Sequence, residues 1–326
     1  MTSFPSRFAF QPSVVQLRSQ DIDEVNHLLS QSQWQPNLVQ LEPGLLEHHY
    51  LIAQLGGIQF ARVTVNLPML HRSGSPDRTI TFALPLSPDP AYTWCGFPLT
   101  QCQIIVHRAN REVNLLGRSS SNFAVVTLDV DDFLGCGMPE DHALFERIFA
   151  ESTHVLAVNQ TTFLRVKHYL QELFTLIQTQ PKKATHPVMQ TIIRNDFLPL
   201  LLECLATSLA MPEASFSHRY QMVKQVEAHM LTHLNQPLTL QDLCTVVGAK
   251  SRTLQTAFLA VYGTSPMAYL KVQRLSGARQ HLQAANPKTD TVVGIATRWG
   301  FWHMGHFSRD YKRMFGETPS KTLKRA

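Results

Sequence analysis

Paired cysteines, long apolar runs and acidic residues near the C-terminus are all scarce in this 326-residue chain. Its five cysteines form no Cys-x-x-Cys pair and no Cys/His spacing typical of zinc, which favours free thiols in a reducing compartment. No run of 18 or more apolar residues occurs, so no membrane-spanning helix is expected. The first residues lack the apolar segment and small-residue cleavage site of a signal peptide. We therefore expect a cytoplasmic protein.

Recognisable catalytic motifs are also missing. The sequence contains no nucleophile elbow, no phosphate-binding loop and no pair of carboxylates with catalytic spacing. His48, His49, His71 and His107 prompt one alternative, a β-barrel metalloenzyme with an attached nucleic-acid-binding module. Since no His-x-His with a following Glu and a distant His is present, we interpret these histidines as core or surface side chains. The sequence thus predicts a protein that is not an enzyme and has no metal or cofactor.

Charge is unevenly distributed along the chain. The residues from Arg219 onward contain 15 Lys or Arg and 5 Asp or Glu, a net charge of +10. Residues 1–218 contain 14 and 19, a net charge of −5. The length predicts two domains, for which we place the boundary between residues 214 and 215. A basic domain joined to an acidic one indicates that only the C-terminal domain meets a polyanion.

The C-terminal domain contains one short unit twice, at Leu238–Pro266 and Asp290–Pro319. Each copy is typical of two helices joined by a tight turn, with a glycine where the chain reverses (Gly248 and Gly300). Small residues stand where the two helices of each unit must cross: Cys244 and Ala296. Two such units in tandem suggest a protein that contacts two neighbouring stretches of DNA.

The repeat predicts a defined spacing between its two units. We expect the first helix-turn-helix at residues 238–262, a linker helix at 266–284 and the second helix-turn-helix at 290–316. A linker helix of about 19 residues is roughly 28 Å long, because an α-helix rises about 1.5 Å per residue. That length is close to the rise of one DNA turn, about 34 Å. The second helices of the two units could therefore enter successive major grooves.

The N-terminal domain is predicted to be β-rich, with a helical part at about residues 139–210, so the whole chain belongs to the α+β class. Leu51–Asn66 is typical of a hairpin that turns at Gly56 and Gly57. Further strands are expected at Thr79–Leu86, Gln103–Arg108, Glu112–Leu116 and Phe123–Val130. Helices are expected at Glu140–Ala150, Gln160–Thr179 and Val188–Leu209, the last kinked or divided by Pro199. The spacing of the strands suits a small barrel or sandwich.

The second copy of the repeat resembles the signature of the AraC/XylS family of bacterial transcription regulators. The residues that carry the resemblance include Ile295-Ala296, Gly300-Phe301, Phe307, Arg309, Lys312, Phe315-Gly316 and Thr318-Pro319. In the first copy they include Leu243, Ser251, Leu254, Phe258, Gly263, Pro266, Tyr269 and Arg274. The resemblance covers about residues 220–326 and implies two helix-turn-helix subdomains joined by a long helix, each with a recognition helix for the major groove.

The same resemblance implies a variable N-terminal domain, which in this family is often a cupin-like β-barrel that binds an effector or mediates dimerisation. The segment WQPNLVQLEPG, the following hairpin and RTITFALPL together resemble the sensor domain of ethanolamine-operon regulators. We therefore expect a sequence-specific DNA-binding transcription regulator, and on family grounds an activator. Its expected partners are double-stranded DNA at a promoter or operator, a second copy of the chain, a small-molecule effector and RNA polymerase, but no membrane.

Polar residues on the free faces of the recognition helices are the candidate DNA contacts. Arginine can bond both acceptors of guanine, and glutamine can do the same for adenine. The candidates for base reading are Arg252, Gln255, Thr256, His306 and Arg309, and those for phosphate contact are Lys271, Lys312, Arg313 and Lys321. The alternative for the first set is contact with phosphate or solvent only. Gly305 departs from the family, which usually has a polar side chain there, so one base contact is expected to be missing.

Other large or charged residues of this region have structural interpretations. Arg274 and Arg279 are candidate ion-pair partners within the protein. Trp34, Trp299 and Trp302 could be mistaken for a stacking platform, but we expect them to pack in the core or cap turns.

Overall fold

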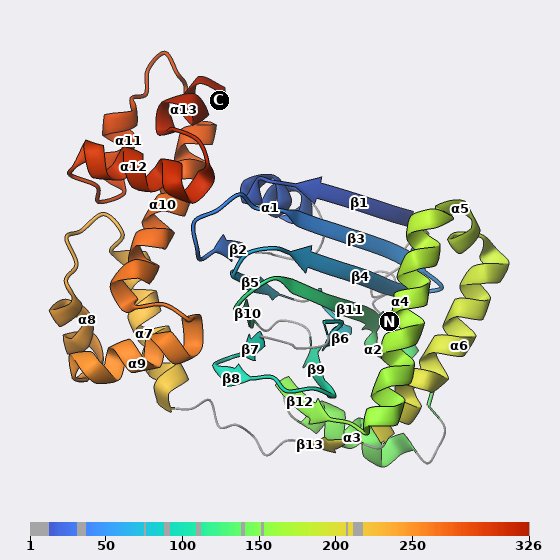
Figure 1. Cartoon of the computed structure of the whole chain (residues 1–326). Helices are drawn as coiled ribbons and strands as arrows, with labels where there is room; N and C mark the ends of the chain where they lie inside the picture. The colour runs from blue at the N-terminus through green and yellow to red at the C-terminus, as the bar shows by residue number, and fades with distance from the viewer. Residues whose placement is uncertain are drawn as a thin grey trace, which may run out of the picture.

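A computed structural model describes residues 13–30, 37–74, 76–87, 92–108, 112–137, 141–150, 153–206, 208–210 and 218–325. The N-terminal part consists of two antiparallel sheets with helices, and the C-terminal part is helical (Figure 1). This arrangement confirms the predicted α+β class. The expected domain boundary at residues 214 and 215 lies outside the described residues.

The larger sheet, which we call the outer sheet, follows the order β1-β3-β4-β11-β6-β9-β12-β13. Its strands are β1 (Ser13–Ser19), β3 (His48–Leu55), β4 (Ile58–Val65), β11 (Ser121–Asp129), β6 (Thr79–Pro85), β9 (Gln103–Arg108), β12 (Thr153–Ala157) and β13 (Leu209–Ala210). The predicted hairpin is confirmed as β3 and β4, paired from His48↔Val65 to Leu55↔Ile58. Gly56 and Gly57 form its turn with φ of 59° and 78°, the positive values that a two-residue hairpin of this kind requires.

The smaller sheet, which we call the inner sheet, follows the order β2-β5-β10-β7-β8. Its strands are β2 (Asn37–Gln40), β5 (Met69–Gly74), β10 (Glu112–Gly117), β7 (Tyr92–Trp94) and β8 (Phe97–Pro98). It lies between the outer sheet and the C-terminal helices (Figure 1). One continuous cluster of buried apolar side chains joins the space between the sheets to the core of the C-terminal domain.

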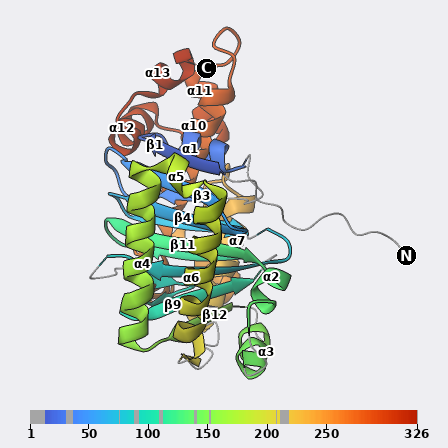
Figure 2. The same ribbon diagram turned by 90° about the vertical axis from the view of Figure 1, so that its right-hand side faces the viewer.

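Helices cover the other face of the outer sheet (Figure 2). They are α4 (Gln160–Thr179) and α6 (Pro187–Ala206), with the shorter α1 (Ile22–Ser30), α2 (Val130–Leu134), α3 (His142–Ala150) and α5 (Pro181–Ala184) elsewhere in this domain. A second apolar core fills the space under α4 and α6, where Phe197 of α6 meets Phe60 of β4 edge to face at 5.1 Å. None of the helices within the described residues is long and apolar enough to span a membrane.

Of the two outcomes expected at Pro199, a kink or a division of the last N-terminal helix, division is wrong, because α6 runs continuously through this residue. Proline removes one backbone hydrogen bond, which usually kinks or ends a helix. Here Phe197, Leu198, Leu201 and Leu202 are all buried on either side of Pro199. Their burial in the core under the helix offsets the lost bond, so packing decides the outcome.

The C-terminal domain matches the predicted series of helices closely. It comprises α7 (His218–Thr232), α8 (Leu240–Val247), α9 (Ser251–Tyr262), α10 (Pro266–Ala284), α11 (Val292–Arg298), α12 (Met304–Phe315) and α13 (Pro319–Arg325). The linker helix α10 has the predicted bounds, and the helix-turn-helix units α8–α9 and α11–α12 lie toward its two ends (Figure 1).

Candidate nucleic-acid interface

The first helix-turn-helix unit is held by a cap, a turn glycine and a small crossing residue. Thr239 caps α8 in a reciprocal arrangement with Asp242, which satisfies backbone N–H groups at the start of the helix. Gly248 ends α8 with φ of 61°, in the left-handed region that glycine adopts most easily. Cys244 is only 4% exposed at the crossing with α9. The predicted roles of Gly248 and Cys244 are therefore confirmed.

The outward face of α9 carries the polar residues of this unit. Leu254 and Phe258 are fully buried, which turns the opposite side of α9 to the solvent. That side presents Arg252, Gln255 and Thr256, all of which are exposed. The structure thus brings the three base-reading candidates of the first unit together on one accessible helix.

The second unit repeats this design on α11 and α12. Thr291 caps α11 by accepting a hydrogen bond from the backbone nitrogen of Gly294 at 3.0 Å. Gly300 forms the turn with φ of 75°, and Ala296 at the crossing is fully buried. Phe307 and Tyr311 pack inward, 1% and 0% exposed. Both turns therefore use a left-handed glycine and a small buried crossing residue, but the second turn, residues 299–303, is longer than the first, residues 248–250.

The exposed face of α12 is more basic than that of α9. His306, Arg309, Lys312 and Arg313 are all exposed on it. The guanidinium of Arg309 lies 2.9 Å from Nδ1 of His306, so the two base-reading candidates of this unit are neighbours in space. Gly305 is also exposed, with open space where a side chain would lie. No atom of the described residues lies within 4 Å of that position, and the absence of one base contact there stays a prediction.

The remaining phosphate-contact candidates, Lys271 and Lys321, are exposed as well. Lys271 on α10 also forms an ion pair with Asp310 of α12, at 2.5 Å between Nζ and Oδ2. This pair ties the linker helix to the second recognition helix. The charge available to DNA from Lys271 is therefore shared with a carboxylate of the protein.

Arg279 and Arg274, the two candidate ion-pair partners, have different partners in the structure. Arg279 is buried and pairs with Asp21 at 2.6 Å and Asp23 at 2.9 Å, with Glu317 further away at 3.8 Å, which confirms the ion-pair prediction for it. Arg274 instead donates hydrogen bonds to the backbone carbonyls of Leu234 and Gln236, so the expectation of an ion pair was wrong there. The carbonyls that follow α7 accept from Arg274 in place of a carboxylate.

Trp299 and Trp302 have different surroundings. Trp299 packs on α10, where its ring occupies the space that a Cβ on Gly277 would need. Trp302 is 59% exposed in the turn just before α12, so of the two expected roles core packing is wrong, and turn capping stays a prediction. Sequence reasoning missed it as a surface residue, although its place between the turn glycine and the recognition helix was a usable signal. Trp34 lies outside the described residues.

The N-terminal domain contacts both helix-turn-helix units. The amide of Asn114 on β10 donates to Tyr220 Oη of α7 at 2.9 Å, and Arg118 donates to the backbone carbonyl of Ala260 near the end of α9 at 2.6 Å. On the second unit, Gln40 donates to the carbonyl of Met314 at 3.2 Å. The two recognition helices are therefore fixed to one support.

The centre of this interdomain contact is a buried charge cluster. Arg72 of β5 pairs with Glu227 of α7, with side chains 5% and 2% exposed, and both bond to Tyr269 of α10. Lys224 adds a second contact to Glu227 at 2.8 Å. Burial acts to raise the pKa of Glu227, but the attraction of Arg72 and Lys224 outweighs burial and lowers it. Glu227 therefore stays ionised, as its cationic partners require.

The four histidines of the metalloenzyme alternative lie on three strands. Within the part of the chain that the structure describes, no three His, Cys, Asp or Glu side chains group as metal ligands would. His48, His71 and His107 are buried, whereas His49 is exposed. Burial, with a contribution from His49, lowers the pKa of His48 to about 4. These residues belong to the interior of the sandwich, apart from His49.

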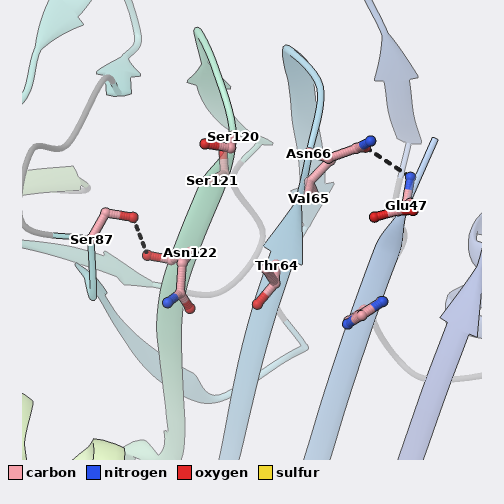
Figure 3. A pocket seen from close by; sticks show the side chains of 9 residues that line it. Glu47, Thr64, Val65, Asn66, Ser87, Ser120, Ser121 and Asn122 are labelled. Carbon is pink, nitrogen blue, oxygen red and sulfur yellow. Dashed lines mark hydrogen bonds between the residues drawn. The ribbon is translucent and has the colours of Figure 1, made fainter. Parts of the chain in front are cut away.

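An open polar groove lies at one end of β3, β4 and β11 (Figure 3). The side chain of Asn66 accepts from the backbone nitrogen of Glu47 at 2.8 Å and donates to the carbonyl of Leu45 at 2.9 Å. Ser87 donates to the carbonyl of Asn122 at 3.5 Å. These side chains satisfy the backbone where the strands end, which accounts for their polar character.

Comparison with known proteins agrees with this geometry. A family model described as a helix-turn-helix domain matches residues 243–325. The "Probable thc operon regulatory protein" of Rhodococcus erythropolis is 34% identical over 151 residues, 43% of this chain and 43% of that protein. The "XylDLEGF operon transcriptional activator 2" of Pseudomonas putida is 30% identical over 125 residues, 38% of this chain and 77% of that protein.

A solved structure, of a probable AraC family transcriptional regulator from Rhodopseudomonas palustris, is 41% identical with a TM-score of 0.30. It covers 32% of this chain and 97% of that one. The chain spans less than half the length of the Rhodococcus relative.

Proposed function

Because the chain belongs to the AraC/XylS family of transcription regulators, we propose that it binds specific DNA sequences and activates transcription. The observation that carries the proposal is the pair of exposed polar helices, α9 and α12, held at the two ends of α10. Each presents groups that can bond base edges, while its apolar face is buried. The net charge of +10 from residue 219 onward would supply attraction to phosphate.

Activation, rather than repression, is proposed from the names of the relatives, several of which are transcriptional activators. Contact with RNA polymerase is part of that proposal. The same relatives support a binding protein rather than an enzyme, acting in the cytoplasm where bacterial DNA lies.

We further propose that the N-terminal domain binds a small effector and joins two copies of the chain. The role of an effector-binding domain is supported by the interdomain hydrogen bonds, because they connect the N-terminal domain to both recognition helices. Val188 and Ile192, which are 62% and 45% exposed and one turn apart on α6, support the joining of two copies, because neighbouring exposed apolar side chains mark a surface that a partner can cover.

Footprinting of the full chain on genomic DNA, followed by sequencing of the protected fragments, tests the DNA-binding proposal. We expect a recurring site with two protected stretches about one helical turn apart, because α10, which is roughly 28 Å long, joins the two helix-turn-helix units. Uniform protection of all sequences at fixed salt would contradict it and would indicate a non-specific binder.

Replacing Arg309 with alanine tests base reading. We expect the affinity for the specific site to fall by about 1–3 kcal/mol, because a bidentate arginine–guanine contact is worth that much. Affinity for random DNA should change little. Titrations of both DNAs by fluorescence anisotropy measure the two losses, and equal losses would make Arg309 a phosphate contact.

Replacing Lys312 with alanine is the matched test of a phosphate contact one turn away on α12. We expect specific and random DNA to lose similar affinity, because a phosphate contact carries no sequence information. The slope of log affinity against log salt should become shallower by about one, since one fewer counterion is released. A loss confined to the specific site would assign Lys312 to base reading.

A further inference from the structure

A cavity lies between the two sheets of the N-terminal domain. The inner sheet contributes Leu38, His71, Trp94 and Leu115 to its wall, and α1 contributes Leu29. The other lining residues come from the outer sheet. The space open to the centre of a water molecule is about 80 Å³. One ordered water needs only about 10–15 Å³ by that measure, so a molecule of several heavy atoms fits.

The wall of this cavity is mainly apolar, although it includes Tyr50, Gln59, Thr81 and the two histidines His71 and His107. Among the described residues that line it, none is Lys, Arg, Asp or Glu. Transferring a charged group from water into such a site without a partner is costly, whereas an apolar group gains from it. The cavity therefore favours an uncharged ligand.

His71 is a polar residue of the wall, and one nitrogen of its ring has no hydrogen-bond partner. Its side chain is 8% exposed, its ring meets Phe123 edge to face at 5.1 Å, and its Nε2 is buried without a hydrogen-bond partner. Burial, with a contribution from His48, lowers the pKa of His71 to about 3, so the ring is neutral at pH 7. A buried polar atom of this kind costs free energy until a partner reaches it. A ligand with one hydrogen-bonding group would provide that partner.

The inner sheet forms a wall one strand thick between the cavity and the C-terminal domain. His71 is paired with Leu38 on one side and Leu115 on the other, and Leu115 is paired with Trp94, so these cavity residues share one face. Side chains alternate between faces along a strand. The next residue of β5, Arg72, therefore points the other way, to Glu227 and Tyr269.

The same alternation holds on the neighbouring strand. Asn114 is paired with Arg72 across β5 and β10 and donates to Tyr220 of α7. Leu115, the next residue, faces the cavity. A ligand that shifted His71 or Leu115 would thus move the backbone that positions both interdomain contacts, because His71 precedes Arg72 and Leu115 follows Asn114 in the chain.

We propose that this cavity binds a compact, uncharged, mainly apolar molecule with one hydrogen-bonding group for His71, and that the inner sheet transmits its presence to the DNA-binding domain. The first part concerns ligand chemistry alone. The second part rests on the proposed function, since it needs a domain that binds DNA.

Three probes of one ring size test the ligand chemistry on the full chain: benzyl alcohol, benzoate and benzylamine. Ligand-observed NMR and the shift in melting temperature report binding. We expect benzyl alcohol to bind and both charged probes to bind at least tenfold more weakly, because they must bury an unpaired charge. Equal binding of the three, or none by benzyl alcohol, would overturn the proposal.

Replacing His71 with phenylalanine keeps a ring but removes the hydrogen bond. Benzyl alcohol should bind roughly 2- to 10-fold more weakly, as expected for one neutral hydrogen bond, whereas toluene should bind as before. His168→Phe, an exposed histidine on α4, is the matched control and should change neither. Ala83→Leu, which fills the cavity, should abolish binding of both probes. If His71→Phe left benzyl alcohol unchanged, His71 would not hold the ligand.

DNA affinity with and without benzyl alcohol tests transmission. We expect a change of about 5-fold or more in the wild-type chain, the usual size of coupling between two sites. In Arg72→Met/Glu227→Leu, the probe should still bind but leave DNA affinity unchanged. Binding of the probe without any effect on DNA in the wild type would overturn transmission. Absence of specific DNA binding with the probe still bound would refute the proposed function and leave the ligand site standing.

Discussion

Replacing Glu227 with alanine is expected to lower the free energy of unfolding by about 3–5 kcal/mol. The substitution leaves the buried guanidinium of Arg72 without its carboxylate, and an uncompensated buried charge costs that much. It also removes an acceptor from Tyr269, whose own pKa is raised well above its ordinary value by burial and then by Glu227. Urea denaturation followed by tryptophan fluorescence and circular dichroism measures the loss.

The double variant Arg72→Met/Glu227→Leu is the control for this prediction. Replacing both members of a buried pair with apolar side chains of similar volume is often neutral or stabilising, so most of the lost stability should return. The comparison separates the cost of an unpaired charge from the cost of losing packing. A fall of less than about 1 kcal/mol in Glu227→Ala would show that water reaches Arg72, in which case the interdomain contact is not sealed.

Replacing Gly300 with alanine is expected to destabilise the second helix-turn-helix unit by about 2–5 kcal/mol. The left-handed conformation of the turn costs an alanine roughly 1–2 kcal/mol. The added Cβ would also lie 2.8 Å from the carbonyl oxygen of Leu234 and 3.0 Å from Cζ of Arg274. It would therefore press on the hydrogen bond that Arg274 donates to that carbonyl, and crowding of this kind costs about 1–3 kcal/mol more.

Gly248→Ala is the matched control, because Gly248 has the same role in the first unit. Its φ of 61° is similarly left-handed, but no atom lies within 4 Å of the position of an added Cβ. We expect a loss of only about 1–2 kcal/mol there. Thermal unfolding compares the two variants, and footprinting should show that Gly300→Ala loses protection of one half-site first. Equal losses would mean that the chain around Leu234 yields to the new methyl group.

Local signals were sufficient to predict the C-terminal domain. The bounds of α10 agree with the prediction, because Ser265 caps this helix and Pro266 suits a first helical turn. The internal repeat aligned the buried residues of both units. The faces of α9 and α12 opposite these buried residues were therefore predicted to be exposed. All the candidate DNA contacts are exposed, while their division into base and phosphate contacts stays a prediction.

The strands of the outer sheet were largely predicted, and those of the inner sheet were mostly missed. β3, β4, β6, β9 and β11 carry apolar runs or a glycine turn. β5 reads MLHRSG, in which His71 and Arg72 interrupt any apolar pattern. Both are nevertheless buried, since one faces the cavity and the other meets Glu227. Both side chains are buried by residues that lie far from β5 in the sequence, so the sequence of the strand alone does not reveal their burial.

The sequence by itself determined two helix-turn-helix units, their spacing and their outward polar faces, because caps, turn glycines and the four-residue period of buried side chains all act within a few residues. Only the tertiary structure decided that α6 continues through Pro199, that Trp302 is exposed and that Arg274 bonds to carbonyls. It also decided that the inner sheet separates a cavity from the DNA-binding domain. These outcomes depend on contacts between residues far apart in the chain. The free energy of such contacts outweighs the conformational preferences of the residues next to them in sequence.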